Sequence, residues 1–489
     1  MRAEEQDVPS GGGAGEETLL SRLSGGLPWW QALLVVGAFA CMIPPWAARM
    51  PSNAGLTMAT LVGLVLLVPV FRDRSTPRVV IIMGLALLLW FVLSAATALV
   101  HGSDPRWSIF HAARPLIAAA DLAFLVWLLR VPRRWPLAVV AVLLGACIAG
   151  TISLYSYSVG QPDVWRYAVG SSLSPLIVVV AAIEWGRGRR VWALALMALI
   201  VGVNVVAGLR SVLLQLAVAI IAAVVFGVAG RLRIPRPMIV TAIATTVIVV
   251  SVIPVYGVIA SSGVLGRQQQ AKWMIQSDMA GGILLGGRPE FPLALDVLPL
   301  VPPLGLGFAP TIPADIAAVR DARAMMHSED AFEGRVPTSD PNYALYVANS
   351  TRNLLAYWSQ PPHGIYLHSS VLQYWLWCGP LVVVPFLVVL LSGLALVGRA
   401  ARRYGAAGVM GAGVLLASFV WDALFSPLGG SGLSLMVLIV ALLAADTVAR
   451  KQQPTQQPSA DGGSHAGSLL PAAPGDGALS GADGAADEA

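Results

Sequence analysis

Three residues between about positions 200 and 400 have side chains suited to chemistry on an anionic substrate. Arg210 lies in the segment GLRSVLLQ, Arg288 in GGRPEF and His368 in HGIYLHSSVLQYWLWCGP. A guanidinium group binds phosphate oxygens through two parallel hydrogen bonds. A neutral imidazole accepts a proton from a hydroxyl group near neutral pH. Together the three residues predict an anion-binding site with a general base.

Each of these residues also has an interpretation without catalysis. An arginine at the end of a membrane helix anchors that end at the interface by snorkelling, and a lone histidine there is often a passive hydrogen-bonding group. Three further residues are auxiliary candidates, namely Glu290, His363 and Asp422. Glu290 can orient Arg288 or assist the base, and Asp422 can border the site. His363 and His327 compete with His368 as the base, but His363 directly follows two prolines.

The sequence predicts no metal and no cofactor. Residues 261–365 contain nine carboxylates, and their nearest pair, Glu329-Asp330, is interpreted as a solvated acidic turn. Cys41, Cys147 and Cys378 all lie in apolar runs, which argues against a disulfide framework or a zinc site.

The composition excludes a soluble enzyme. Of the 489 residues, 56% are hydrophobic and 12% are charged, whereas ordinary soluble domains have about 25% charged residues. The net charge of +5 comes from scattered arginines rather than a basic face, so nucleic acid is not an expected partner. The membrane bilayer is the expected environment.

Apolar runs predict an all-α polytopic membrane protein with about twelve transmembrane helices. A bilayer core about 30 Å thick requires roughly 20 apolar residues per helix. The predicted spans are residues 29–47, 54–71, 79–100, 112–129, 136–158, 168–185, 191–208, 211–229, 237–260, 380–398, 406–425 and 431–448.

The arginine distribution predicts that both termini are cytoplasmic, because positive residues concentrate in cytoplasmic connections. In that orientation nineteen Arg and Lys residues lie inside and five lie in the short outer connections and adjoining helix ends. The outer five are Arg49, Arg106, Arg114, Arg166 and Arg210.

Five charged residues fall within or at the ends of predicted spans, where charge is costly: Arg114, Asp121, Glu184, Asp422 and Asp446. Asp121 follows Arg114 by seven residues, so the two can share a helix face and pair. Glu184 and Asp446 lie at predicted cytoplasmic ends, where solvation by water is expected.

The expected organisation has five parts. Residues 1–27 and 450–489 are predicted to be disordered cytoplasmic tails, because they contain few large apolar residues. Residues 28–260 form transmembrane helices 1–9, and residues 261–365 form one large extracytoplasmic loop between helices 9 and 10. Residues 366–449 form a half-buried helix and helices 10–12. The loop is interpreted either as a cap on the bundle or as a cover over an active site.

Short motifs follow one another in a characteristic order between about residues 200 and 400. They are Leu209-Arg210-Ser211, then Gly287-Arg288, then Pro303-Leu304-Gly305-Leu306-Gly307-Phe308, then His368-Ser369 with Gly379 eleven residues after the histidine. In this order and placement the chain resembles the O-antigen ligase and O-antigen polymerase family of multispanning bacterial enzymes. It differs where Leu209 replaces the usual Ser, where Ser369 replaces the usual Asn, and in lacking a Trp shortly after Arg288. These differences indicate a divergent member.

The resemblance implies a metal-independent glycosyltransferase in the bacterial cytoplasmic (inner) membrane, with an outward-facing active site. The donor would be a polyprenyl-diphosphate-linked glycan, and the acceptor a hydroxyl of a glycan, lipid or protein in the synthesis of cell-envelope polysaccharide. Arg210 and Arg288 would bind the diphosphate, and His368 would be the catalytic base of an inverting transfer.

The sequence is also compatible with two other functions. A polymerase of the same family would extend the lipid-linked glycan itself. A transporter or flippase for a lipid-linked or amphipathic solute would instead have ionisable residues at the bilayer midplane, whereas the candidates here gather at one face.

Overall fold

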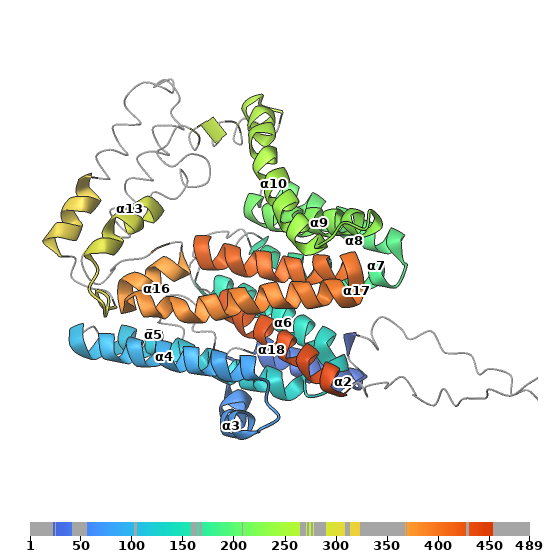
Figure 1. The fold of residues 1–489 in the computed structure, drawn as a ribbon. Helices are drawn as coiled ribbons and strands as arrows, with labels where there is room; N and C mark the ends of the chain where they lie inside the picture. Colours follow the sequence, from blue (N-terminus) through green and yellow to red (C-terminus); the bar gives the residue numbers. More distant parts are fainter. Residues whose placement is uncertain are drawn as a thin grey trace, which may run out of the picture. The chain divides into compact units, whose positions relative to one another are not determined.

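The structure is a computed structural model that describes residues 23–24, 26–41, 56–101, 105–157, 164–165, 169–207, 209–264, 270, 273–274, 277, 290–308, 313–322, 367, 369–426 and 430–452. These residues form helices and contain no β-strand (Figure 1). The long helices are α2 (Trp29–Ala40), α3 (Met58–Arg72), α4 (Arg78–His101), α5 (Pro105–Leu128), α6 (Trp135–Tyr157), α7 (Gly170–Gly186), α8 (Arg190–Val206), α9 (Arg210–Arg231), α10 (Pro237–Ser261), α17 (Val384–Phe425) and α18 (Gly430–Gln452). The short ones are α13 (Glu290–Val297), α16 (Ser370–Cys378) and the 3-10 turns η2 (Pro132–Arg134), η4 (Leu298–Leu300) and η5 (Pro380–Val383).

Each predicted span overlaps one of these apolar helices, and the spans 380–398 and 406–425 both fall largely on α17. Residues 42–47 of the first predicted span lie outside the described residues. In the described part of the chain, seven helices are long and apolar enough to cross a membrane. α2, α3, α7 and α8 have 12, 15, 17 and 17 residues and are shorter than that. Large apolar side chains such as Val65, Leu99 and Val206 are exposed, as a lipid environment permits. The chain is therefore an all-helical polytopic membrane protein, while the count of twelve spans stays a prediction.

The 42-residue helix α17 is a hairpin of two antiparallel arms. Gly405 has φ +60° and ψ −139°, which breaks the helix between the predicted spans 380–398 and 406–425. The arms pack together, since a Cβ built at Gly393 would lie 2.6 Å from Leu416 Cδ1. We call the end at Gly405 the closed end. The opposite end, where the first arm begins and the second arm finishes, is the open end.

Helix α9 lies antiparallel to the second arm of α17. Near its start, Gln215 Oε1 accepts a hydrogen bond from Ser418 Oγ at 2.9 Å. Near its end, a Cβ at Gly227 would lie 3.7 Å from Ala406 Cβ. Residue numbers therefore rise along α9 as they fall along the second arm, so α9 begins, at Arg210, toward the open end.

Polar side chains join α3 to α5 and α5 to α16. Thr57 and Thr60 form a capping box at the start of α3, and Thr60 Oγ1 also donates to Asp121 Oδ1 at 2.8 Å. Arg114 Nη1 donates to the hydroxyl oxygen of Tyr374 at 3.0 Å. Arg114 and Asp121 thus bind partners on two different helices, which differs from the expected pairing along one helix face.

Two of the arginine-rich connections lie together. Arg130 Nη2, after α5, pairs with Asp73 Oδ2, after α3, at 2.6 Å. Hydrogen bonds from the backbone and hydroxyl of Ser75, with a smaller contribution from Arg130, lower the pKa of Asp73 below its usual value. Asp73 is therefore ionised at neutral pH, and the two connections lie on one side of the bundle, as the charge distribution predicts.

The expected solvation of Glu184 is wrong. Glu184 is only 4% exposed. Its carboxylate pairs with Arg187 at 2.7 Å and with Arg189 at 3.7 Å. Burial requires such a carboxylate to be paired, and the two arginines of the following connection supply the pairs. Asp446 likewise forms ion pairs, with Arg399, Arg403 and Arg450.

Some of the predicted domain boundaries fall among the described residues. Helix α18 continues to Gln452, three residues beyond the predicted limit of 449, because Arg450 pairs with Asp446 one turn earlier. Within the predicted loop 261–365, α13, η4 and residues 314–322 are helical. Residues 1–22 and 453–489, most of the predicted tails, lie outside the described residues.

The topology can be tested by single-cysteine labelling in a chain whose three native cysteines are replaced by alanine. We expect Ser75→Cys and Lys451→Cys to react with a membrane-impermeant maleimide only in inside-out vesicles. Ser262→Cys, after the predicted ninth span, should react only in right-side-out vesicles. Labelling of Ser75→Cys and Lys451→Cys from different sides would contradict the arrangement.

Candidate functional site

Most of the predicted site residues have side chains outside the part of the chain that the structure describes. Arg288, His363 and His368 lie wholly outside it. For Arg210 and Glu290 the helix backbone is described, at the first residues of α9 and α13, but the side chains are not. Asp422 is described and half-buried. The geometry of the site therefore comes from Asp422 and from the neighbours of the other residues.

The segment that follows His368 docks on the open end of α17. Ser370 Oγ donates to the carbonyl oxygens of Asp422, at 3.2 Å, and Ser426, at 2.8 Å. Ser369 Oγ donates to the carbonyl oxygen of Ala423 at 3.4 Å. The structure thus brings the backbone of Asp422 beside Ser370, the first residue of α16. Ser370 follows His368 by two residues in the sequence.

The segment that follows Arg288 reaches the same end of α17. Phe291, three residues after Arg288 and one after Glu290, stacks on Phe425, with ring centroids 5.8 Å apart. Phe425 is the last residue of α17 and lies three residues after Asp422. Both motif segments therefore contact the last turn of the same helix.

A buried apolar cluster holds these segments together. It joins α13, through Leu293, to α16, through Leu372 and Leu376. It also contains Leu306 of the Pro-x-Gly-x-Gly-Phe motif and Leu367, the residue directly before His368. Leu293, Leu306, Leu367, Leu372 and Leu376 are each less than a tenth exposed, so the residues flanking both motifs share one packed core.

The Pro-x-Gly-x-Gly-Phe motif is hydrogen-bonded to the end of α16. The amides of Leu306 and Gly307 donate to the carbonyl oxygens of Leu376 and Trp377 at 2.7 and 3.1 Å. Gly379, eleven residues after His368, has φ +85°, and a Cβ there would overlap the carbonyl oxygen of Pro303. The spacing between His368 and Gly379 thus has a physical basis, because α16 spans it and only glycine fits where the motif crosses.

The sequence interpretation missed a buried polar cluster beside this motif. His111 and Arg114 of α5 are 3% and 4% exposed, and both lie near the hydroxyl of Tyr374, at 3.5 Å from His111 Nδ1 and 3.0 Å from Arg114 Nη1. The His111 ring stacks on Phe308 with centroids 5.1 Å apart. The sequence does contain a signal for this cluster, because His111 and Arg114 lie three residues apart, on one face of an otherwise apolar helix.

Metal-binding groups do not gather among the described residues. No three His, Cys, Asp or Glu side chains in these ranges lie close enough to hold one metal ion. The expectation of a metal-free reaction stays a prediction, since the histidines and acids of the predicted site fall largely outside these ranges.

Comparison with known proteins gives no match, either to a model of a protein family or to a curated protein. The resemblance to the O-antigen ligase and polymerase family stays a prediction.

The contact at Gly379 gives a stability test. Gly379→Ala adds a Cβ that overlaps Pro303 and imposes a left-handed backbone on alanine, so we expect a loss of about 2–5 kcal/mol. Gly398→Ala is the matched control, because a Cβ there meets nothing within 4 Å. Thermal unfolding in detergent should show a large loss for Gly379→Ala and little change for Gly398→Ala. Equal melting temperatures would contradict the docking of the motif on α16.

Proposed function

We propose that this chain is a glycosyltransferase that moves a glycan from a polyprenyl-diphosphate carrier to an acceptor hydroxyl. The reaction takes place at the outer face of the bacterial cytoplasmic membrane, at the open end of α17. It uses neither a nucleotide sugar nor a metal ion. Of the two activities of the family it resembles, ligation to a separate acceptor is the one proposed.

The convergence at the open end of α17 is the observation that supports this proposal. The residues after His368 hydrogen-bond to Asp422, Ala423 and Ser426, and a residue just after Arg288 stacks on Phe425. Helix α9, which begins with Arg210, starts toward the same end. The motifs of Arg210, Arg288 and His368 extend over about 160 residues of sequence. Described residues near each of them lie toward the open end of α17.

The chemistry of the side chains fits a direct displacement. Breaking the bond between the anomeric carbon and the diphosphate oxygen leaves negative charge on the diphosphate. Arg210 and Arg288 stabilise that charge by bidentate hydrogen bonds. His368 removes the proton of the acceptor hydroxyl as its oxygen bonds to the anomeric carbon. Attack from the face opposite the leaving group inverts the anomeric configuration.

A reaction with a lipid-linked donor also fits the surroundings. Apolar side chains such as Val224 of α9 and Leu387 and Leu391 of α17 are exposed, so the polyprenyl chain can remain in the bilayer beside these helices. Asp422, at the end of α17, borders the acceptor side and can orient the base, as can Glu290.

The decisive assay uses purified protein, a polyprenyl-diphosphate oligosaccharide and candidate acceptors, with EDTA present. His368→Ala should lower transfer by about 10²–10⁴-fold, the contribution of a general base. Arg288→Ala should lower it by about 10²–10³-fold, through lost stabilisation of the leaving group. His327→Ala and Arg267→Ala are the matched controls and should retain transfer. Full activity of His368→Ala would show that another residue is the base.

The same assay separates the alternatives. A ladder of products on the lipid carrier, with no separate acceptor modified, would identify a polymerase. Movement of intact donor across a vesicle membrane without cleavage would identify a transporter or flippase. Loss of activity in EDTA would contradict the metal-independent mechanism.

A further inference from the structure

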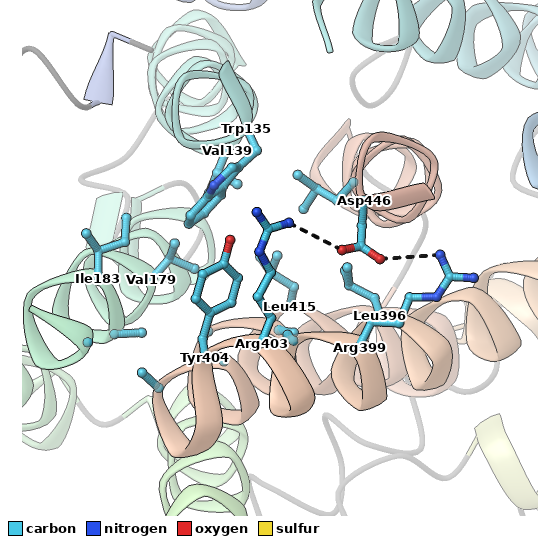
Figure 2. A pocket seen from close by; sticks show the side chains of 18 of the residues that line it. Trp135, Val139, Val179, Ile183, Leu396, Arg399, Arg403, Tyr404, Leu415 and Asp446 are labelled. Carbon is cyan, nitrogen blue, oxygen red and sulfur yellow. Dashed lines mark hydrogen bonds and ion pairs between the residues drawn. The ribbon is translucent and has the colours of Figure 1, made fainter. Parts of the chain in front are cut away.

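A cavity of about 350 Å³ lies at the closed end of the α17 hairpin, among α6, α7, both arms of α17 and α18. Its walls are largely apolar, as Figure 2 shows. The large apolar side chains that line it include Trp135, Val139, Val179, Ile183, Leu415 and Leu442. Cavities of this size and character are typical of sites for small molecules with an apolar part.

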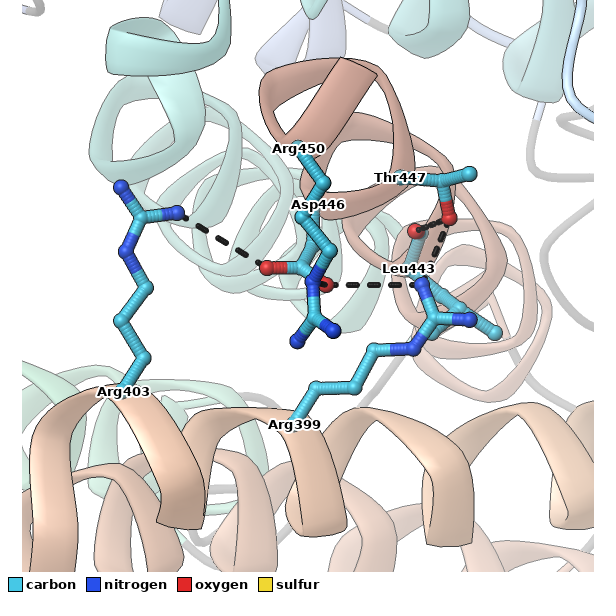
Figure 3. Close-up of polar contacts among 6 residues, drawn as sticks. All are labelled: Arg399, Arg403, Leu443, Asp446, Thr447 and Arg450. Carbon is cyan, nitrogen blue, oxygen red and sulfur yellow. Dashed lines mark hydrogen bonds and ion pairs between the residues drawn. The ribbon is translucent and has the colours of Figure 1, made fainter. Parts of the chain in front are cut away.

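Arginines and a single carboxylate lie at one side of this cavity (Figure 3). Asp446 of α18 pairs with Arg450 at 3.0 Å, Arg399 at 3.4 Å and Arg403 at 3.8 Å. Arg399 Nη1 also donates to Thr447 Oγ1 at 2.6 Å. One negative charge thus lies among three positive charges, which leaves an excess of two.

A second pair of arginines follows helix α7. Arg187, which also lines the cavity, and Arg189 both pair with Glu184. Arg187 therefore adds a third guanidinium group to the lining of the cavity, beside those of Arg399 and Arg403. Mutual repulsion among guanidinium groups makes binding of a further anion favourable there.

Arg403 is the arginine best placed to receive such an anion. Its side chain is 44% exposed, and its separation of 3.8 Å from Asp446 Oδ1 is too long for a hydrogen bond. Its guanidinium donors are therefore not consumed by that carboxylate. In Figure 2, Arg403 and Tyr404 extend from α17 toward Trp135 of α6, across the cavity.

We propose that this cavity binds an anionic phospholipid, with the phosphate on Arg403 and Arg399 and an acyl chain against the apolar walls. Guanidinium groups bind phosphate oxygens in bidentate geometry. Basic pockets between membrane helices on the cytoplasmic side are suited to anionic headgroups, and the charge distribution predicts that the closed end is cytoplasmic. Apolar walls beside a cationic cluster favour an amphiphile over a free anion.

This site is separate from the proposed transfer site. The first arm of α17 runs from Val384, at the open end, to Tyr404, beside the cavity. At 1.5 Å per residue, these about 20 residues separate the two ends of the hairpin by about 30 Å. Lipid binding at the closed end is therefore measurable without a glycan donor and does not depend on the proposed transfer reaction.

The test is a titration of purified full-length protein in neutral detergent, followed by native mass spectrometry. Dioctanoyl-phosphatidylglycerol is the anionic probe. Dioctanoyl-phosphatidylcholine has the same chains without net charge, and glycerol phosphate has the anion without chains. We expect the anionic lipid to bind at least tenfold more tightly than either of the others.

Two variants locate the site. Arg403→Ala should weaken binding of the anionic lipid about fivefold, as expected for one arginine near a lipid phosphate. Ala412→Phe should weaken it at least as much, because Ala412 lines the cavity and the larger ring fills it. Arg402→Ala is the matched control, since Arg402 is exposed on the same turn but does not line the cavity.

Several outcomes would overturn the proposal. Equal binding of the two lipids would exclude charge recognition, and equal binding of glycerol phosphate would exclude a role for the apolar walls. Equal loss in Arg402→Ala and Arg403→Ala would indicate general surface attraction. If Ala412→Phe fails to fold, the comparison of the two arginine variants decides alone.

Discussion

The last carbonyl groups of α17 have no hydrogen-bond donor within their own helix, and in apolar surroundings each needs one from elsewhere. Ser369 Oγ donates to the carbonyl oxygen of Ala423, and Ser370 Oγ donates to those of Asp422 and of Ser426, the residue that follows the helix. The Asp422 carbonyl also accepts from the amide of Ser426. Ser369 at the same time accepts from an amide in the first turn of α16. One pair of serines thus forms hydrogen bonds at the end of α17 and at the start of α16. This fixes α16 on α17, and the packing of α13 and of the Pro-x-Gly-x-Gly-Phe motif follows from it.

The two ends of the α17 hairpin have different chemistry. At the open end, hydrogen bonds and an aromatic contact hold the segments after Arg288 and His368 against the last turn of α17. At the closed end, arginines exceed carboxylates around an apolar cavity. Because each arm is a single rigid helix, the two ends are held at a fixed separation. A catalytic role for the open end and lipid binding at the closed end are therefore compatible within one hairpin.

Local patterns predicted individual helices well and their polar partners poorly. The apolar runs located α4, α9 and α10 to within a few residues, because helix formation in lipid depends on the segment itself. The same patterns suggested that Arg114 pairs with Asp121 and that water solvates Glu184. Arg114 instead donates to Tyr374, 260 residues away in sequence. Such partners depend on which helices pack together, which no local window contains.

The sequence by itself determined that the chain is helical and lies in a membrane, and it identified Arg210, Arg288 and His368 as candidates for one face. These conclusions follow from hydropathy, charge distribution and side-chain chemistry, which are properties of composition and order. Only the tertiary structure decided that Gly405 is the residue that breaks α17, that Ser369 and Ser370 join this helix to α16, and that an apolar cavity forms among four helices. Each of these depends on contacts between segments far apart in the chain, because hydrogen bonds and cavities require atoms from both sides to meet.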